Sequence, residues 1–340
     1  MPVMGVRLEP ADEYTHELGP EPSFNESMYV NVFDPAQRLG GFFRLGNRAN
    51  EGYAEMTVCL YLPDGRVGFM YKRPTIAGNA ALDAGGLTWE VVTPFEELTV
   101  RYQGKVVVLD DPTEMADPKA AFTANPYDEC EVDLTFVGQG RASMFGGEPD
   151  RPHEAEGEEF AKGHYEQLVE GSGRVRVGDQ EWEVAGCGLR DHSWGPRSWQ
   201  APWYYRWLTA NVDRDFGFMA SRVARRDGPG TRGGFVWEDG TLHLCDDVEL
   251  ATDFEGDDAY HRAIRSTLRS SRSGREWTFT GSVMNLIPLR NRRQDPDGNQ
   301  LVTRISEGLT EWTTADGRTG YGLSEYLDQI VDGRPVGLAE

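Results

Sequence analysis

The sequence has no long apolar run and little cysteine. No window approaches the roughly 18 to 20 uncharged apolar residues that a membrane helix needs, and the segment Met1–Leu18 lacks the basic and then apolar pattern of a secretion signal. The 4 cysteines are scattered without a Cys-x-x-Cys pair, as is typical of a reducing compartment. These absences predict a cytoplasmic protein with no integral membrane segment.

Motifs for nucleotides and metals are also missing. The chain has no P-loop and no Gly-x-Ser-x-Gly elbow. Its 6 histidines are isolated, and His243 with Cys245 lacks the paired spacing of a structural zinc site. The 56 acidic and 34 basic residues give a net charge of -22, which repels nucleic acid. We therefore expect no cofactor, no metal and no nucleic-acid partner. The oligomeric state stays open.

Glycine and turn dipeptides are abundant, and they favour short strands. The chain has 40 glycines, 19 prolines and 11% aromatic residues. Five dipeptides separate apolar runs and suit the positive φ angles of hairpin turns: Asp64-Gly65, Gly178-Asp179, Asp239-Gly240, Ser273-Gly274 and Asp316-Gly317. Helical patterns are restricted to Glu158–Val169 and Ala259–Leu268. We predict an all-β fold of antiparallel strands with few short helices.

The length fits two domains, because domains commonly hold roughly 100 to 200 residues. Residues Phe145–Gly173 are acidic and poor in β-branched residues, so we place the boundary there and expect β domains at 1–170 and 171–340. Each fits an antiparallel barrel or sandwich, and a barrel interior can hold one small ligand. The pattern Glu-Gly-x-x-Glu occurs at Glu51 and at Glu307, which either records a duplication or is coincidence.

The most unusual segment is Gly186–Trp199, which follows a predicted strand at Trp182–Ala185. If the strand continues, Asp191 points to one face with apolar neighbours, whereas His192 points to the other. Desolvation would keep the Asp191 carboxyl protonated near neutral pH, as a general acid requires. Alternatively, Asp191 accepts hydrogen bonds at a strand end and pairs with Arg190 or Arg197.

Aromatic residues gather immediately downstream. Trp203, Tyr205 and Trp207 alternate onto one strand face, and Trp194 and Trp199 precede them. These rings could form the wall of an apolar pocket of a few hundred cubic ångströms, or stabilise a cationic intermediate. Ordinary core packing is the alternative interpretation.

Asp191-His192-Ser193-Trp194-Gly195, preceded by Gly186-x-Gly188, resembles the Asp-His-Asn-Trp-Gly signature of the carotenoid 1,2-hydratase (hydroxyneurosporene synthase) family. Segments around Phe24–Tyr29, Gly40–Arg44, Glu307–Trp312 and Gly322–Tyr326 resemble an uncharacterised branch of that superfamily. The resemblance implies tandem lipocalin-like β-barrels, no cofactor, an apolar isoprenoid or similar substrate, and Asp191 as proton donor. Ser193 stands where Asn is usual and Arg190-Asp191 replaces an aromatic approach, so the resemblance does not by itself imply a carotenoid as the substrate.

Two functions follow from these residues. The first is a hydratase, dehydratase or double-bond isomerase that acts by acid catalysis on a terpenoid, steroid or similar lipophilic molecule. The second is a non-catalytic carrier, which has no use for a buried ionisable group. The expected catalytic residues are Asp191, His192, Glu311 and Glu325. The expected substrate-binding residues are Glu26, Tyr29, Trp194, Trp199, Trp203, Tyr205, Trp207 and Tyr326.

Overall fold

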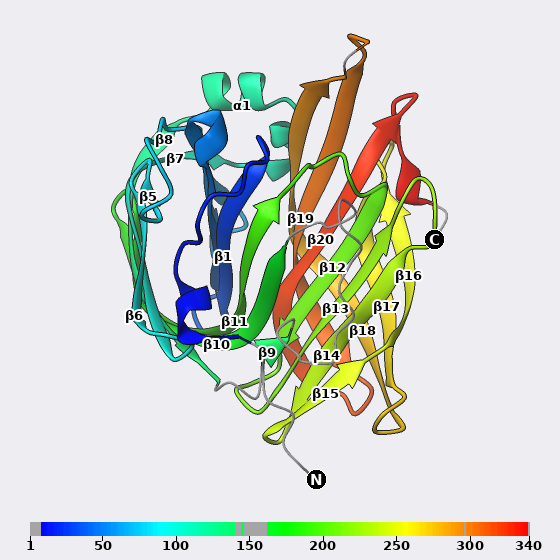
Figure 1. Ribbon diagram of the computed structural model, residues 1–340. Coiled ribbons are helices and arrows are strands. Elements are labelled where there is room, and N and C mark those ends of the chain that lie inside the picture. Colours follow the sequence, from blue (N-terminus) through cyan, green and yellow to red (C-terminus); the bar gives the residue numbers. More distant parts are fainter. Residues whose placement is uncertain (1–7, 140–143, 146–161, 296, 339–340) are drawn as a thin grey trace. The chain divides into compact units, whose positions relative to one another are not determined.

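The computed structural model describes residues 8–139, 144–145, 162–295 and 297–338. Antiparallel strands dominate these residues, and α1 (Pro118–Ala124) is the α-helix among them (Figure 1). The predicted all-β fold with few short helices is therefore confirmed. The chain forms two compact units: the first holds residues up to Val108 together with Pro126–Ser198, and the second holds Leu109–Asn125 together with the residues from Trp199 onward.

The first unit is a closed barrel. Its strands run in the order β4-β3-β2-β1-β11-β10-β8-β7-β6-β5, and an additional pairing of β4 with β7 closes the ring. Closure leaves the strands of the ring, from β4 to β7 in this order, without a free edge, while β6 and β5 continue from β7 outside the ring. The elements are η1 (Pro10–Glu13), β1 (Phe24–Asp34), β2 (Leu39–Arg48), η2 (Ala49–Glu51), β3 (Tyr53–Tyr61), β4 (Val67–Lys72), β5 (Asp83–Ala84), β6 (Leu87–Thr93), β7 (Glu97–Leu109), β8 (Tyr127–Gly138), β9 (Met144–Phe145), β10 (Gly163–Val177) and β11 (Gln180–Pro196).

The second unit is one strongly curved sheet in the order β15-β14-β13-β12-β20-β19-β18-β17-β16. Its two end strands, β15 and β16, are joined through Asp246 alone, so the sheet curves until its ends approach. The elements are η3 (Pro112–Ala116), α1, β12 (Tyr204–Asn211), β13 (Phe216–Ala224), β14 (Thr231–Glu238), β15 (Thr241–Cys245), β16 (Asp247–Glu255), β17 (Tyr260–Ser270), β18 (Arg275–Gln294), β19 (Gln300–Thr314), β20 (Thr319–Val331), β21 (Arg334–Pro335) and η5 (Val336–Leu338).

The two units share one topology. In each, four consecutive strands form a meander, and the first strand of that meander pairs with the last long strand of the unit, β1 with β11 and β12 with β20. The two copies of the Glu-Gly-x-x-Glu pattern do not lie at equivalent positions of this shared topology. Glu51 precedes β3, the third strand of its unit, whereas Glu307 lies in the penultimate long strand of the other.

The predicted boundary at 170/171 differs from the observed division after Ser198. Residues Gly163–Val177 form β10, which pairs with both β8 and β11 inside the first sheet. The predicted boundary segment Phe145–Gly173 is acidic and contains several glycines, but its residues from Gly163 onward belong to this strand, and the barrel cannot close without β10. The predicted linker therefore includes a central strand of the first unit.

Both predicted helices are wrong. Gly163–Val169 belongs to β10, while Glu158–Lys162 of the same prediction lies mostly outside the described residues. Ala259–Leu268 coincides almost entirely with β17. In both segments sheet pairing overrides a weak local pattern. All five predicted hairpin turns are confirmed, with positive φ at Gly65, Gly178, Gly240, Gly274 and Gly317.

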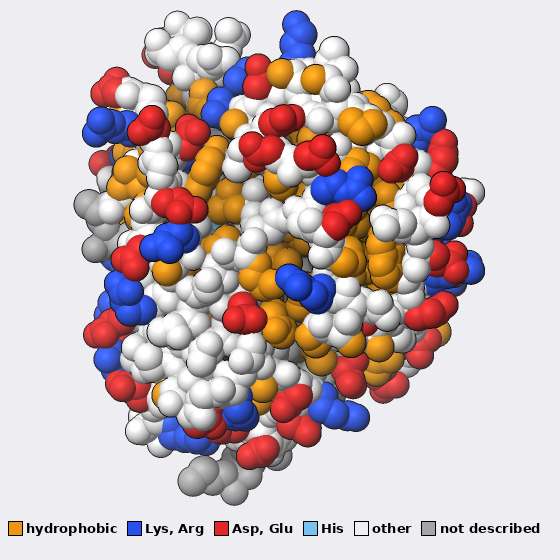
Figure 2. Space-filling view, turned by 180° about the vertical axis from the view of Figure 1, so that it is seen from behind, with side chains coloured by type: hydrophobic (Ala, Val, Ile, Leu, Met, Phe, Trp, Pro, Cys, Tyr) orange, Lys and Arg blue, Asp and Glu red, His pale blue; other side chains and the backbone are white. Residues whose placement is uncertain are grey.

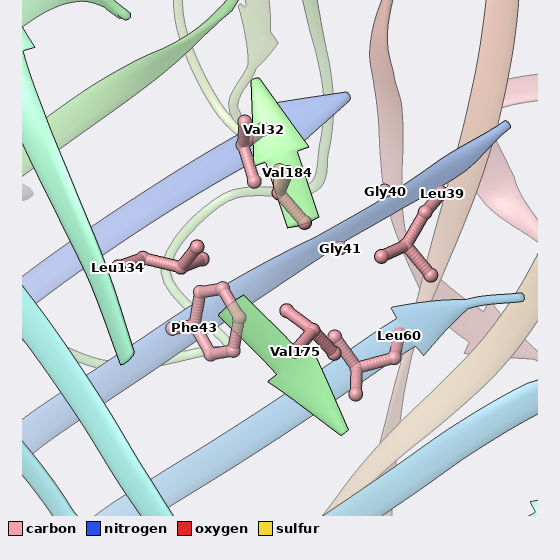
Figure 3. A pocket seen from close by; sticks show the side chains of 9 residues that line it. All are labelled: Val32, Leu39, Gly40, Gly41, Phe43, Leu60, Leu134, Val175 and Val184. Carbon is pink, nitrogen blue, oxygen red and sulfur yellow. The ribbon is translucent and has the colours of Figure 1, made fainter. Parts of the chain in front are cut away.

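Apolar side chains fill the interior of the first barrel. Val32, Phe43, Leu134 and Val184 point toward one another around a cavity of about 10 Å³ (Figure 3). That volume has room for about one water molecule. This part of the barrel is therefore packed core and not a ligand chamber.

The interior of the second unit is also an apolar core. Phe218 stacks on Phe279 with ring centroids 4.0 Å apart, and Trp312 packs edge-on against Phe218.

On the molecular surface, acidic and basic side chains are interspersed (Figure 2). The exposed Arg269, for example, pairs with Asp247 and Glu249 on the neighbouring strand.

Candidate active site

Strand β11 carries the central motif and lies between β1 and β10, as Figure 1 shows. Two glycines in β11 permit a close approach to β1. A Cβ at Gly188 would lie 1.8 Å from the carbonyl oxygen of Asn31, so no side chain fits there. The neighbouring Leu189 N–H donates to Asn31 Oδ1 at 3.0 Å. These contacts fix the register that places Tyr29 opposite Asp191.

An ionic cluster lies on the face of β11 that points away from the barrel interior. His164 Nε2 contacts Asp191 Oδ2 and lies 3.5 Å from Glu166 Oε1. The Asp191 side chain is 17% exposed and that of His164 31% exposed, while Glu166 is buried. The cluster is thus partly desolvated but remains open to solvent on one side.

The proton of this cluster resides on the histidine. Burial disfavours the imidazolium, but the charge and hydrogen bond of Asp191, with help from Glu166, raise the pKa of His164 to about 10. Burial likewise opposes ionisation of Asp191, yet the charge of His164 outweighs it and holds the pKa of Asp191 below its usual value. The expectation of a neutral Asp191 near pH 7 is therefore corrected: Asp191 is a carboxylate.

The two arginines proposed as alternative partners of Asp191 differ in their relation to it. Arg190 points to the opposite face, where its guanidinium forms a buried ion pair with Glu13. Tyr165 also donates to Glu13, at 2.9 Å. Arg197 donates to Ser193 Oγ at 3.0 Å and contributes its charge to Asp191.

Two predicted site residues, Glu26 and His192, lie inside the barrel. His192 Nε2 is 2.6 Å from Glu26 Oε1, and the backbone N–H of His16 donates to Glu26 Oε2 at 2.7 Å. Burial would raise the pKa of Glu26, but hydrogen bonds from His16 and His192 lower it to about 2. Trp194 stacks on His16 at 3.9 Å. The structure thus separates Glu26, His192 and Trp194 from Asp191, because they occupy the other face of the sheet.

Several predicted residues belong to the second unit. Tyr205 is buried and donates its hydroxyl to Glu325 Oε1. Trp207 lies opposite Glu325 in register on β12. Glu311 accepts a hydrogen bond from Tyr321 at 3.1 Å.

The remaining predicted aromatic residues have separate environments. The guanidinium carbon of Arg226 lies over the indole ring of Trp203, 4.3 Å from the ring centroid. The carbonyl oxygen of Trp199 accepts from Gln329 Nε2 at 2.9 Å. Tyr326 points into the core, stacks on His261 at 4.0 Å, and so lies on the face opposite Glu325.

Sequence reasoning missed His164 as a site residue, and it missed Glu13 altogether. Reading Gly163–Val169 as a strand would have placed His164 and Glu166 on one face, directly beside Asp191. No local signal marks Glu13, because its partner Arg190 is 177 residues away.

Two groups in the described residues have the donor types of a metal site. They are His16, Glu26 and His192, and His164, Glu166 and Asp191, and within each group the ligand-type atoms lie within 4.8 Å of one another. In both groups imidazole nitrogens contact carboxylate oxygens directly. The expectation that the protein needs no metal stays a prediction.

Fold and site together define a tandem all-β protein with an acid–base cluster on β10 and β11 of its first barrel. Residues 9–330 match the family described as "Domain of unknown function (DUF7064)", and the chain belongs to this family. No curated protein matches the sequence.

Solved structures show the same fold at low sequence identity. Kievitone hydratase from Nectria haematococca aligns with a TM-score of 0.57 and 11% identity over 95% of this chain and 93% of its own. A protein of Nitrosomonas europaea assigned as an AttH aligns with a TM-score of 0.56 and 15% identity over 95% and 98%. CghA aligns with a TM-score of 0.51 and 13% identity over 90% of this chain and 88% of its own. Among the described residues, no helix is long and apolar enough to cross a membrane.

Proposed function

We propose that the protein is a cofactor-independent hydratase, dehydratase or double-bond isomerase for an apolar isoprenoid, steroid or similar lipophilic small molecule. The observation that carries the proposal is the half-buried pair of His164 and Asp191 with Glu166 beside it. Buried ionisable groups cost free energy, and such groups are common where protons are transferred. Kievitone hydratase, which has this fold, is named for a hydration.

The chemistry assigns Asp191 the role of proton acceptor in the hydrating direction. A C=C bond takes up a proton, water adds to the resulting cation, and the added water loses a proton to a base. Asp191 is ionised and can accept that proton. His164 stays protonated and holds the carboxylate in place. Dehydration runs these steps in reverse, so the Asp191 carboxyl returns the proton to the departing hydroxyl group, which leaves as water. In isomerisation no water adds, and the Asp191 carboxylate accepts a proton from a carbon next to the cation.

Isotope incorporation tests this function before the natural substrate is known. The protein is incubated in H₂¹⁸O and in D₂O with four kinds of compound: kievitone, an isoprenoid alkene, an isoprenoid tertiary alcohol and a sterol. The masses of the recovered compounds are then measured by mass spectrometry. We expect ¹⁸O or deuterium in at least one class, and loss of this label in Asp191→Asn. A carrier would return every compound unlabelled, even a compound that binds.

A further inference from the structure

A row of small side chains lies beside Asp191, on the face that points away from the interior of the first barrel. On this face Asp191 of β11 lies opposite Tyr29 of β1, which lies opposite Arg44 of β2. Two residues further along the three strands, the next row holds small residues in register: Ser193, Ser27 and Gly46. All of these residues belong to the first unit. Because the side chains of this row are short, larger neighbours can extend over it.

Asn25 extends over this row and carries a buried amide without a partner. It is the next residue after Ser27 on this face of β1, and it is 1% exposed. Among the described residues, neither Asn25 Oδ1 nor Asn25 Nδ2 has a hydrogen-bond partner. A Cβ at Gly46 would lie 2.8 Å from Asn25 Oδ1, so the amide points over Gly46. Buried polar groups are rarely left unpaired, because an unmade bond costs free energy, so this amide is suited to a ligand.

Two arginines of β2 border the same position. Arg44 Nη2 also lies 2.8 Å from the Cβ position of Gly46. Arg48, the next residue on this face of β2, is buried and contacts Glu51 through Nε and the carbonyl oxygen of Arg197 through Nη2. Among the residues that the structure describes, Arg48 Nη1 has no hydrogen-bond partner. Two guanidinium groups and one amide therefore lie around Gly46.

Five charged side chains at this position carry one positive charge in excess. Glu55 of β3 lies 3.2 Å from Arg44 Nη1 and 3.4 Å from Arg73 Nη2. Burial would raise the pKa of Glu55, but the charges of Arg44, Arg48 and Arg73 lower it, so Glu55 is ionised. Arg48 also pairs with Glu51. Three guanidinium groups thus face two carboxylates, and one further negative charge would balance them.

A carboxylate matches these donors. It carries one negative charge, whereas a phosphate monoester carries about 1.5 to 2 at pH 7. Its two oxygens fit the planar fork of a guanidinium group. A half-turn of the Asn25 amide exchanges its oxygen and nitrogen, so the amide N–H can donate to the same carboxylate. One acid group of a ligand would therefore supply both the balancing charge and acceptors for these hydrogen bonds.

We propose that Asn25, Arg44 and Arg48 bind a carboxylate group of the substrate. The inference rests on the proposed function and narrows the substrate to a lipophilic carboxylic acid. Neighbouring strands lie about 4.8 Å apart and alternate residues of a strand about 6.7 Å apart, so the Cα atoms of Gly46 and Asp191 are roughly 12 Å from each other. The acid group is held at this distance from the proton-transfer group, and the reacting double bond lies near Asp191.

Nuclear magnetic resonance tests the site with a small probe, 3-methylbut-2-enoate, which is an isoprenoid acid. In the wild-type protein we expect a saturable shift of the Asn25 side-chain NH₂ signals, which Asn25→Ala identifies by removing them. The methyl ester of the probe should cause no such shift, and inorganic phosphate should bind more weakly than the acid. Absence of the shift, an equal response to the ester, or tighter binding of phosphate overturns the inference.

Substitutions then locate the carboxylate, with affinities measured from the Gly46 backbone amide signal. Arg48→Gln should weaken binding of the probe by about 10-fold or more, because it loses a hydrogen bond to a charged group. The control Arg101→Gln removes an exposed arginine of the same unit, paired with Glu90 at 3.0 Å, and should bind the probe like wild type. Asn25→Ala should also weaken binding and serves if Arg48→Gln does not fold. Wild-type affinity in the Arg48 or Asn25 variant contradicts the site.

Thermal unfolding of the ligand-free protein separates a binding role of Asn25 from a structural one. Asn31 lies on the same face of β1, is also buried, and accepts a hydrogen bond from the Leu189 N–H at 3.0 Å. Asn31→Ala should lower the melting temperature because it leaves this N–H unpaired, whereas Asn25→Ala breaks no hydrogen bond and should change it far less. An Asn25→Ala protein as destabilised as Asn31→Ala would assign the Asn25 amide a structural role.

The labelling assay, extended to an isoprenoid acid and its methyl ester, separates this inference from the proposed function. The acid should have the lower KM, and Asn25→Ala should raise that KM by about 10-fold while kcat changes little. Label in acid and ester with equal KM contradicts the carboxylate site and leaves the proposed function intact. A wild-type protein that incorporates no label refutes the proposed function, and the titration with 3-methylbut-2-enoate still decides whether the site binds a carboxylate.

Discussion

In the first unit Glu166 lies opposite Asp191 and His164 lies beside them, whereas in the second unit Glu307 lies opposite Glu325. The residue pairs on either side of Glu307 and Glu325 along their strands are aliphatic. The backbone scaffold is the same in both: a first strand paired with a last strand, and a glycine that brings them together. Next to these acidic residues the preceding strand holds His164 in the first unit and Ile305 in the second, so an imidazole lies in one unit where an aliphatic side chain lies in the other. Three sets of substitutions and one titration test this contrast.

The largest effect is expected for Asp191→Asn. The substitution keeps the shape but removes the proton acceptor, so turnover should fall by about 10² to 10⁴. His164 can lose its proton when its partner is neutral, so the free energy of unfolding should fall by only about 1 to 2 kcal/mol. Label incorporation and thermal unfolding measure the two quantities. Loss of stability and ligand binding together, in proportion to the loss of activity, would assign Asp191 a structural role.

Glu13→Gln should destabilise the first unit alone. Arg190 occupies the position that Ser324 has in the second unit, and its buried ion pair with Glu13 has no counterpart at Ser324, which bonds to Thr310 Oγ1 at 2.6 Å. Removing one partner of a buried pair costs about 3 to 5 kcal/mol. Hydrogen exchange should show the loss in first-unit amides. Glu131→Gln, which breaks an exposed pair with Arg176, is the control and should cost less than about 1 kcal/mol.

Alanine at the equivalent glycines tests the shared scaffold. Gly188→Ala and Gly322→Ala each drive a Cβ into a backbone carbonyl, so each should lower the free energy of unfolding by about 1 to 3 kcal/mol. Gly78→Ala, with open space around it and no positive φ, is the control and should be close to neutral. Denaturant unfolding measures all three. A large cost at one glycine and none at the other would break the equivalence.

Histidine titration by NMR gives the subtlest contrast. The folded-state pKa of His164 lies above the ordinary 6.5, so its contribution to stability is complete below about pH 6.5 and is lost as the pH rises through about 10. His261 in the second unit behaves oppositely. Burial and the charge of Arg206 lower its pKa to about 3, so stability falls as the pH drops below about 6.5. His164 titrating near pH 6.5 in the wild-type protein would contradict the ion pair.

Turn dipeptides and strand alternation were enough to predict the fold class, since each Asp-Gly or Gly-Asp turn joins residues that are neighbours in sequence. The boundary and the segment around His164 failed for a different reason. Gly163–Val169 is polar at several positions and becomes a strand only because β11 and β8 pair with β10. These pairing partners lie outside the segment itself, so its own residues do not predict the strand.

The two faces of the site strands could not be assigned from sequence. Alternation correctly separated Asp191 from His192, but β1 is buried along its whole length, so burial does not distinguish its inner from its outer face. Glu26 and Tyr326 were therefore predicted to bind the substrate together with the catalytic residues Asp191 and Glu325, although their side chains point into the interiors of the two units. Only closure of each sheet determines which face points inward.

The pairing of β1 with β11 also has a consequence for biosynthesis. During synthesis, β1 leaves the ribosome before the other strands of the first unit. Its partner β2 follows directly, but its second partner, β11, is made only after almost the entire first unit. Contacts between segments so distant in sequence form slowly, because the intervening loop must be closed before they are gained. Asp191 lies on this last strand, β11. An unfinished barrel therefore exposes an unpaired strand edge and lacks the assembled cluster of His164, Glu166 and Asp191, so the activity proposed above requires a barrel that has closed.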